Sequence, residues 1–386
     1  MYTSWVEVSK SALLHNLKQY QRLVGPDVAV MPIVKSNAYG HGMTKVAKMV
    51  APKVSWLGVV NLAEALELRH AGIKKKIFVL SYAQPELLEQ GIRQNVALPV
   101  YTESFARQVS QTAKNVGRVA RLHIKIDTGT SRVGFLADDA ARAIKRIGQL
   151  PNVVIEGVWS HFAASEENRS FTNRQLQKFQ QVLAQLKKEG IEVPYRHFAC
   201  SAASITTPIA HFNLVRLGLS LYGLWPSKHI EHIARRRSPW LTLKPALTWK
   251  TRIIQVKEVA AGSKISYGGT FTVKKKTKLA VLAIGYWEGY DRHLSNQGSV
   301  LIGGQRCPVL GRVCMNLTMV DVSNIKNVKA GDEAVLIGEQ GGPPSPSGLR
   351  RGRGVVTVDE LAEKIGTINY EVVTRINPLL ERVSVK

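Results

Sequence analysis

The chain has 386 residues, 45% of them hydrophobic, which is long enough for two domains or for one large barrel with an accessory domain. No apolar run approaches the roughly 20 residues that a bilayer crossing needs. The first residues lack the basic and apolar segments of a signal peptide, so we expect a cytoplasmic protein with no membrane partner. The three cysteines, Cys200, Cys307 and Cys314, have no metal-ligand spacing, and we expect no metal site.

The formal net charge of +25 comes from clusters of lysine and arginine that are scattered along the chain. A cationic surface favours anionic substrates or cofactors and nonspecific contact with nucleic acid. A basic nucleic-acid-binding protein is therefore one interpretation, but no nucleic-acid-binding motif accompanies the clusters. We favour a solvated basic surface and expect no specific nucleic acid partner.

Up to about residue 225, short apolar strands alternate with helical stretches that have a polar face. The expected strands are 28–34, 56–60, 77–80, 96–100, 121–126, 153–159, 195–200 and 214–217, and the expected helices include 62–71, 85–90, 104–115, 138–147 and 174–188. This alternation predicts an α/β protein whose residues 1–238 form a (β/α)8 barrel of the TIM type. A doubly wound sheet is the weaker interpretation, because no glycine-rich phosphate turn follows the first strand.

The pattern changes after Pro239. Residues 245–340 alternate between apolar and polar side chains, with glycine-rich turns between the runs, which predicts a mostly β domain over residues 239–386. The segment 341–354, rich in proline, glycine and arginine, is expected to be an exposed loop that is dispensable for chemistry. A last helix is expected over 358–367, with Thr357 as its cap ahead of Glu360.

Active sites of such barrels lie at the carboxyl ends of the strands, and this chain carries chemically active residues at many of these ends. Lys35 follows the first strand, where shielding by apolar neighbours disfavours the ammonium form and leaves an amine that can form a Schiff base or act as a base. The other strand ends carry Lys125, Asp127, Arg132 in the next loop, His161, His197, Ser201 and Arg216. The loops after strands seven and eight commonly bind a phosphate, so Ser201 and the amides near Gly218 are candidate ligands. This clustering predicts an enzyme.

Seven motifs, in order between residues 4 and 382, make the chain resemble the alanine racemases, which are pyridoxal-phosphate enzymes of fold type III. The motifs are VKSNAYGHG (34–42), KIDTGTSRVG (125–134), WSHFA (159–163), VRLGLSLYG (215–223), ISYGGTF (265–271), GRVCM (311–315) and INYE (368–371). The resemblance implies interconversion of L-alanine and D-alanine through an external aldimine, with D-alanine used for peptidoglycan. It also implies a homodimer in which the C-terminal domain completes the active site of the partner.

Carried over residue by residue, the resemblance implies that Lys35 binds pyridoxal 5'-phosphate and is one of two bases. Tyr267, from the partner subunit, is the opposite base, and His161 and Arg216 assist its proton transfer. Arg216 faces the pyridine nitrogen and is oriented by His197. Because a guanidinium keeps its proton, the ring nitrogen stays unprotonated.

The remaining implied roles concern the phosphate and the substrate carboxylate. Tyr39, Ser201 and Tyr370 bind the phosphate together with the Gly218 region. Arg132 contacts the cofactor and the substrate carboxylate, and Met315 of the partner contacts that carboxylate through its backbone amide. The residue equivalent to Lys125 is often carbamylated in the family, which would resolve the repulsion between Lys125 and Arg132.

Two departures from the family pattern concern the entrance to the site. Asn316 stands where the family usually has aspartate, and the segment 285–290 carries a bulkier pair, Trp287 and Glu288, than is usual. These departures leave open a broader amino-acid racemase, for example one that accepts serine. Two further classes fit the sequence less well: a fold-type III decarboxylase has a different first motif, and a pyridoxal-phosphate carrier generally lacks the β domain.

Overall fold

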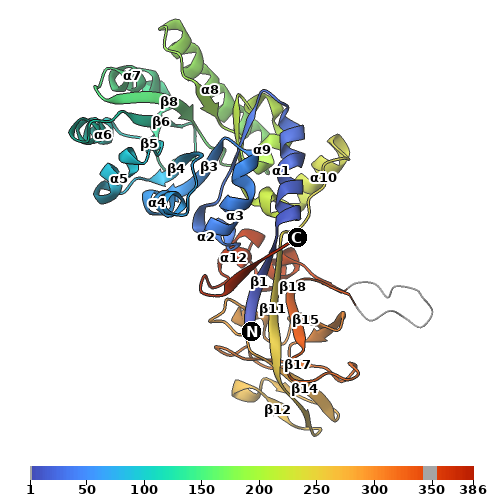
Figure 1. Cartoon of the computed structure of the whole chain (residues 1–386). Helices are drawn as coiled ribbons and strands as arrows, with labels where there is room; N and C mark the ends of the chain where they lie inside the picture. The colour runs from blue at the N-terminus through green and yellow to red at the C-terminus, as the bar shows by residue number, and fades with distance from the viewer. Residues whose placement is uncertain (1, 342–353) are drawn as a thin grey trace. The chain divides into compact units, whose positions relative to one another are not determined.

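The structure is a computed structural model that describes residues 2–341 and 354–386 (Figure 1). Most of the predicted loop 341–354 lies outside the described residues. The chain divides into two compact units. We call Ser11–Ala38 with Met43–Lys244 the barrel unit, and Met1–Lys10, Tyr39–Gly42 and Pro245–Lys386 the β unit.

The barrel unit contains the eight parallel strands expected from the sequence. They are β2 (Ala29–Pro32), β3 (Trp56–Asn61), β4 (Lys76–Tyr82), β5 (Leu98–Val100), β6 (Ala120–Asp127), β8 (Val153–Trp159), β9 (Tyr195–His197) and β10 (Leu214–Leu217). Parallel pairs join β3 to β4, β5 to β6 to β8 to β9, and β10 to β2. Bridges from Ile33 to Gly58 and from Phe78 to Ala97 connect these sheets, and Arg216 N donates to Ala199 O between β10 and the chain after β9. The predicted (β/α)8 barrel is therefore confirmed.

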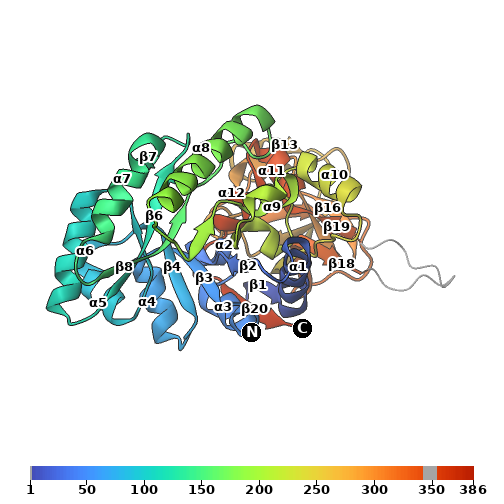
Figure 2. The same cartoon turned by 90° about the horizontal axis from the view of Figure 1, so that it is seen from above.

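Helices follow the strands and pack an apolar face on the barrel; Figure 2 shows α5, α6 and α7 outside the strands β4, β6 and β8. In α7, Ala140, Ala141, Ile144 and Ile147 are buried at helical spacing, as expected for a barrel helix. The helices of the unit are α1 (Lys10–Val24), α2 (Lys35–Tyr39), α3 (Met43–Val50), α4 (Leu62–His70), α5 (Leu88–Arg93), α6 (Glu103–Asn115), α7 (Ala137–Gly148), α8 (Arg169–Lys188), α9 (Ser201–Thr206) and α10 (Lys228–Arg237), and the short strand β7 (Phe135–Leu136) pairs with β6.

The β unit is built on one large sheet, with β16-β15-β18-β11-β1-β20 as its main path. The strands of this unit are β1 (Ser4–Ser9), β11 (Leu247–Val259), β12 (Lys264–Ile265), β13 (Phe271–Thr272), β14 (Thr277–Leu282), β15 (Ser299–Ile302), β16 (Gln305–Pro308), β17 (Thr318–Asp321), β18 (Glu333–Gln340), β19 (Gly354–Val356) and β20 (Glu381–Val385). Its helices are α11 (Val358–Ile365), where Thr357 caps Glu360 N as predicted, and α12 (Asn369–Thr374). The predicted mostly β second domain is confirmed.

The division of the chain differs from the expected boundary at residues 238 and 239. Residues 4–9, which we expected in the barrel domain, form β1, antiparallel to β11 and parallel to β20. Trp5, Val6 and Val8 are buried in this sheet. The physical reason is that a short apolar strand at the start of the chain can pair its backbone groups equally well in either sheet. The strand with which it pairs therefore determines the unit to which it belongs. Among the described residues, no helix combines the length and apolar character that crossing a membrane requires.

Candidate active site

The segment labelled α2, which follows β2, is not a regular α-helix but a turn in the left-handed backbone region. Ser36, Asn37, Ala38 and Tyr39 all have φ between 53° and 55°, a conformation that costs a non-glycine residue roughly 1–2 kcal/mol. Such strain persists where the surrounding structure imposes it, and it is common at active sites. Asn37 supports the turn, because its side-chain oxygen accepts a hydrogen bond from Met43 N (3.0 Å). The predicted loop after the first strand is therefore a fixed turn.

Glu64 holds this turn from α4, and sequence reasoning missed it. Its carboxylate accepts hydrogen bonds from Ser36 N (2.6 Å) and Val60 N (2.8 Å). Asn61 caps α4 by accepting from Glu64 N, so the two residues have the spacing of a capping box. That spacing is the signal in the sequence that could have identified Glu64.

The pKa of Lys35 lies below the ordinary value for lysine. Burial disfavours the ammonium form and is the largest cause, and the charge of Arg132 lowers the pKa further, whereas Glu64 acts in the opposite direction. A neutral amine is the form that attacks a carbonyl carbon or accepts a proton. The predicted destabilisation of the Lys35 ammonium is confirmed in its direction.

Arg216 on β10 is buried and donates to five acceptors, none of which is a carboxylate. Nη1 donates to His197 O and His197 Nδ1, both at 2.9 Å. Nη2 donates to Ser160 O (2.7 Å), Phe198 O (2.9 Å) and His161 Nδ1 (3.1 Å). The structure thus brings the predicted residues Arg216, His161 and His197 together.

The contacts of Arg216 fix the protonation of both histidines. A guanidinium only donates, so the imidazole nitrogens that face it, Nδ1 of His161 and Nδ1 of His197, act as acceptors and carry no proton. Burial and the charge of Arg216 also lower the pKa of each histidine well below its ordinary value. The buried guanidinium is therefore flanked by two neutral imidazoles, each with its proton on Nε2.

Lys125 on β6 and Arg216 both lie close to the ring of Trp159. Lys125 Nζ lies 3.9 Å from the centroid of the Trp159 ring, and the Arg216 guanidinium lies 5.2 Å from the same centroid. Lys125 is 2% exposed, and its Nζ has no hydrogen-bond partner in the described part of the chain. Burial lowers the pKa of Lys125 well below the usual value, with further contributions from Arg216 and Arg132. Burial and the neighbouring guanidinium charges therefore disfavour the ammonium form of Lys125, and its amine has no hydrogen-bond partner within residues 2–341 and 354–386.

The turn that leads to Arg132 is organised by Asp127. One oxygen of its carboxylate accepts hydrogen bonds from the backbone of Gly129 (2.8 Å), Thr130 (2.9 Å) and Ser131 (3.2 Å). These bonds to the charged form, opposed by burial, lower the pKa of Asp127. Arg132 follows directly and is exposed. Asp127 was predicted at this strand end, and the structure assigns it to holding the loop.

Ser201 and Gly218 meet after the seventh and eighth barrel strands, as predicted. Gly218 N donates to Ser201 Oγ at 3.0 Å, and Ser201 is buried at the start of α9. This hydrogen bond orients the Ser201 hydroxyl, whose own O–H is left to donate, at the end of the barrel where a phosphate commonly binds in this fold.

The remaining predicted residues belong to the β unit. Tyr39 and Tyr370 have ring centroids 6.3 Å apart. In the same unit, Gly40 approaches α12 so closely that a Cβ would lie 2.0 Å from Val373 O. A glycine is therefore required where the chain after Tyr39 passes Val373.

Tyr267 and Met315 are exposed on the β unit, with 74% and 55% of their surface accessible. Tyr267 begins a 3-10 turn, Tyr267–Gly269, and follows Ser266, which has a φ of 64°. Ser266 Oγ donates to Arg312 O (2.7 Å) and contacts Cys314 Sγ (3.3 Å). These contacts join the two segments that carry Tyr267 and Met315.

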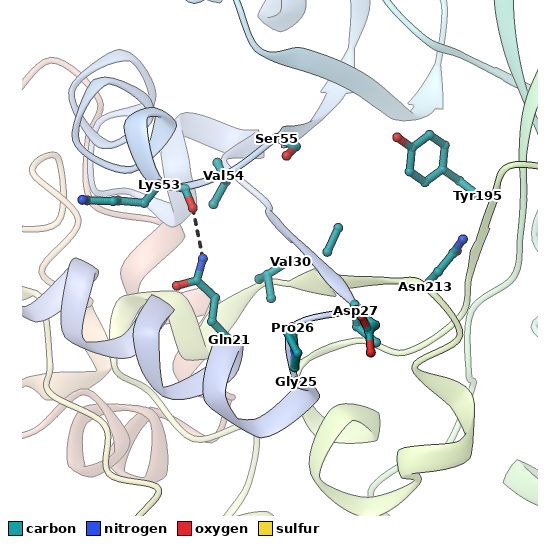
Figure 3. Close-up of a pocket in the computed structure, with 12 residues that line it drawn as sticks. Gln21, Gly25, Pro26, Asp27, Val30, Lys53, Val54, Ser55, Tyr195 and Asn213 are labelled. Atoms are coloured by element: carbon teal, nitrogen blue, oxygen red, sulfur yellow. Dashed lines mark hydrogen bonds between the residues drawn. The ribbon is translucent and has the colours of Figure 1, made fainter.

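A cavity of about 550 Å³ lies in the barrel unit at the amino ends of the strands (Figure 3). It is lined by residues that precede or begin β2, β3, β9 and β10, among them Asp27, Ser55, Tyr195 and Asn213. Catalytic groups of this fold lie at the opposite ends of the strands. This cavity is therefore separate from the candidate site.

Comparison with known proteins gives a consistent result over the whole chain. The family described as "Alanine racemase, N-terminal domain" matches residues 8–226, and "Alanine racemase, C-terminal domain" matches residues 246–384. Alanine racemases of Methanococcus maripaludis and Desulforamulus reducens are 39% and 40% identical to the chain, each over 98% of both sequences.

Solved structures agree with these sequence matches. The alanine racemase of Clostridium difficile 630 has a TM-score of 0.91 and 32% identity, covering 100% of this chain and 96% of that one. A histidine racemase of Leuconostoc mesenteroides has the same fold with a TM-score of 0.87, at 26% identity. The chain therefore belongs to the alanine racemase family, whose members are pyridoxal-phosphate-dependent isomerases.

Proposed function

We propose that the chain interconverts L-alanine and D-alanine with pyridoxal 5'-phosphate, and that Lys35 and Tyr267 are its two bases. The observation that carries the proposal is the set of contacts around Arg216, a buried guanidinium between two neutral imidazoles at the end of the last barrel strand. The names of relatives about 40% identical over the full chain support alanine as the substrate.

The residues present fit the cofactor. Lys35 offers an amine with a lowered pKa, and Ser201 offers a hydroxyl donor for a phosphate, oriented by a hydrogen bond from Gly218 N (3.0 Å). Arg216 would face the ring nitrogen, and Tyr39 and Tyr370 would add hydroxyl groups to the phosphate. When bound, pyridoxal phosphate supplies an electron-withdrawing ring that acidifies the α-hydrogen of the attached amino acid.

Each residue has a distinct task in this proposal. Lys35 removes or returns the α-proton on one side, and Tyr267 does so on the other. Arg216 keeps its proton and so leaves the ring nitrogen unprotonated. Arg132 binds the substrate carboxylate together with the backbone amide of Met315, which, like Tyr267, would come from the partner subunit.

Lys125 is the residue that we propose is carbamylated. Its buried amine has a lowered pKa and no hydrogen-bond partner in the described structure, so its neutral form is suited to attack carbon dioxide, forming an N–C bond and releasing one proton. The resulting anion would offset the charge of Arg132. Carbon-13 NMR after equilibration with labelled bicarbonate should show a carbamate signal that is absent in Lys125→Ala.

The test of the reaction is racemisation in deuterium oxide, starting from each enantiomer. We expect deuterium at the α-carbon of the product from both directions, with alanine turned over faster than serine, histidine, lysine or arginine. Equal or faster turnover of a long side chain would refute alanine as the preferred substrate and favour a broader racemase.

The shared site is tested by mixing two inactive variants. Lys35→Ala lacks one base and Tyr267→Phe lacks the other, so each homodimer should be inactive. If Tyr267 acts in the site of the partner subunit, a mixed dimer has one site with both bases and should recover up to about half of the activity of one wild-type dimer, because activity requires both proton-transfer groups in one site. The absence of any recovery after subunit exchange would contradict partner-supplied Tyr267.

We also propose that the enzyme acts in the cytoplasm and supplies D-alanine for peptidoglycan. This part rests on the resemblance of the motifs alone. Expression of the chain in a bacterial strain that requires D-alanine should restore growth, and expression of Tyr267→Phe should not.

A further inference from the structure

A row of buried side chains extends from Arg216 across the barrel. His197 accepts from Arg216 with Nδ1, and its Nε2 lies 2.8 Å from Nδ1 of His123 on β6. The other ring nitrogen of His123, Nε2, lies 3.6 Å from Oε2 of Glu156 on β8. Both histidines have no exposed surface, and Glu156 has 5%. The row therefore joins four barrel strands out of contact with water.

The ends of the row determine where its protons lie. Arg216 only donates, so His197 carries its proton on Nε2 and donates it to Nδ1 of His123. His123 must then carry its own proton on Nε2, which faces the carboxylate of Glu156, a group that only accepts when ionised. A donor-only group at one end and an anion at the other favour a single arrangement of protons. The contact between His123 Nε2 and Glu156 Oε2, at 3.6 Å, is electrostatic and too long for a hydrogen bond, and neither atom has a hydrogen-bond partner in the described part of the chain.

Local packing is built around the His123 ring. Gly157 of β8 is paired with His123 across the sheet, and a Cβ at Gly157 would lie 2.4 Å from His123 Nδ1. The ring stacks on Phe78 at 4.5 Å between centroids. This close fit leaves His123 little freedom to leave the row.

Glu156 is held in its charged form at the far end. Its Oε1 accepts from Lys76 Nζ at 2.7 Å and from Arg121 at 3.4 Å. His123 and Lys76 outweigh the effect of burial and lower the pKa of Glu156 to about 2. The acceptor end of the row is therefore an anion at any pH at which the enzyme is expected to work.

We propose that His123 and Glu156 are positioning residues for Arg216, acting through His197. His123 accepts a hydrogen bond from His197 Nε2, and the negative charge of Glu156 favours the His123 tautomer with its proton on Nε2, so that the Nδ1 lone pair of His197 faces the guanidinium. Hydrogen bonds in such a row polarise one another, which strengthens the bond at Arg216. The importance of this row for catalysis rests on the proposed function, in which Arg216 faces the cofactor ring.

A matched pair of substitutions separates this role from packing. The side chains introduced by His123→Asn and His123→Leu have nearly the same shape, but only asparagine offers a hydrogen-bond acceptor to His197 Nε2. The holoenzyme is labelled with nitrogen-15 histidine, and NMR identifies which ring nitrogen of His197 is protonated. We expect His197 to keep its Nε2 proton in both variants, because Arg216 still faces Nδ1. This proton has an acceptor in His123→Asn and none in His123→Leu, so the Nε2 signal of His197 should shift clearly only in His123→Leu.

Kinetics provide the second measurement. An unpaired buried donor at His197 should lower kcat of His123→Leu by about tenfold or more, while kcat of His123→Asn stays within about threefold of the wild type. KM for alanine should be unchanged in both, because the row ends at Arg216 and not at the substrate carboxylate. An equal loss in both variants, with the signals of His197 unchanged in His123→Leu, would overturn the proposal.

Glu156→Gln tests the far end of the row and also serves if His123→Leu does not fold. This variant removes the negative charge that faces His123 Nε2, so the signal of His123 Nε2 should shift; an unchanged signal would remove Glu156 from the row. His211→Leu is the control, because His211 is a buried histidine of the same unit that contacts Ser204 O (2.8 Å) and lies outside the row.

The NMR result does not depend on turnover, so a protein with the expected tautomers but no alanine racemisation would refute the proposed function and not the row.

Discussion

Lys35 shows how a few neighbouring side chains set the charge of one functional group. Burial and Arg132 lower its pKa, and Glu64 alone among the interacting groups raises it. Glu64 also binds the backbone at Ser36, so one carboxylate both shapes the turn after β2 and tunes the amine that precedes it. The same residue thus controls geometry and protonation.

Glu64→Gln should therefore lower the pKa of Lys35 further. The depressed pKa means that the neutral amine predominates at a lower pH, so the pH midpoint for cofactor incorporation should move downward. The rate at which the cofactor absorbance develops on the apoprotein, measured against pH, checks this. Glu67→Gln is the control, because Glu67 accepts from Thr44 instead of the turn. A midpoint that stays in place or moves upward in Glu64→Gln would contradict this account.

At the scale of elements, two loops of the β unit are joined near Met315. Tyr286 N donates to Cys314 O (3.0 Å), and Trp287 N donates to Met315 O (2.9 Å). The carboxylate of Glu288 completes the link, since it accepts from Asn316 Nδ2 and from Gly285 N, both at 2.8 Å. The two departures from the family pattern that the sequence showed, at 288 and 316, are therefore partners of each other.

Asn316→Asp should separate these loops, because a second carboxylate replaces the donor that Glu288 binds. The loss of one hydrogen bond and the added repulsion should raise KM for alanine about threefold or more, with a smaller change in kcat. The double variant Asn316→Asp with Glu288→Gln restores a donor opposite an acceptor and should recover KM. Initial rates over a range of alanine concentrations measure both constants. If the double variant were no better than Asn316→Asp alone, the pair would have no part in placing Met315.

The elements themselves were largely predictable, because each barrel strand is a short apolar run with polar-faced helical sequence on either side. The turn after β2 was not, since its four left-handed residues include no glycine and their conformation depends on support from Glu64 and Asn37. The sequence also did not predict that β1 belongs to the β unit, because the alternation of apolar and polar residues in a strand does not show which strand it pairs with. The clustering of Arg216, His161 and His197 was predicted from strand ends, whereas His123 lies mid-strand and gave no such signal.

At the scale of the whole molecule, exposed apolar side chains gather on the loops that carry the proposed partner-site residues. Tyr286, Trp287, Met315 and Leu317 lie on the two joined loops, and Ser266 links the segment of Tyr267 to Cys314. A contiguous exposed apolar patch on a monomer commonly marks an interaction surface. This patch supports the proposed homodimer with shared sites.

Trp287→Asp places a charge in the centre of this patch, and we expect it to raise the dissociation constant of the dimer about a hundredfold or more, as loss of a large buried aromatic contact does. Light scattering after size exclusion should show a shift toward monomer, and specific activity should fall with dilution in parallel, because the proposed function takes Tyr267 from the partner subunit. Val119→Asp, at the amino end of β6 on the barrel unit, exchanges a comparably exposed apolar residue and should remain a dimer. A monomeric Trp287→Asp protein with full activity would show that one chain contains a complete site, and it would refute the assignment of Tyr267 to the neighbouring subunit.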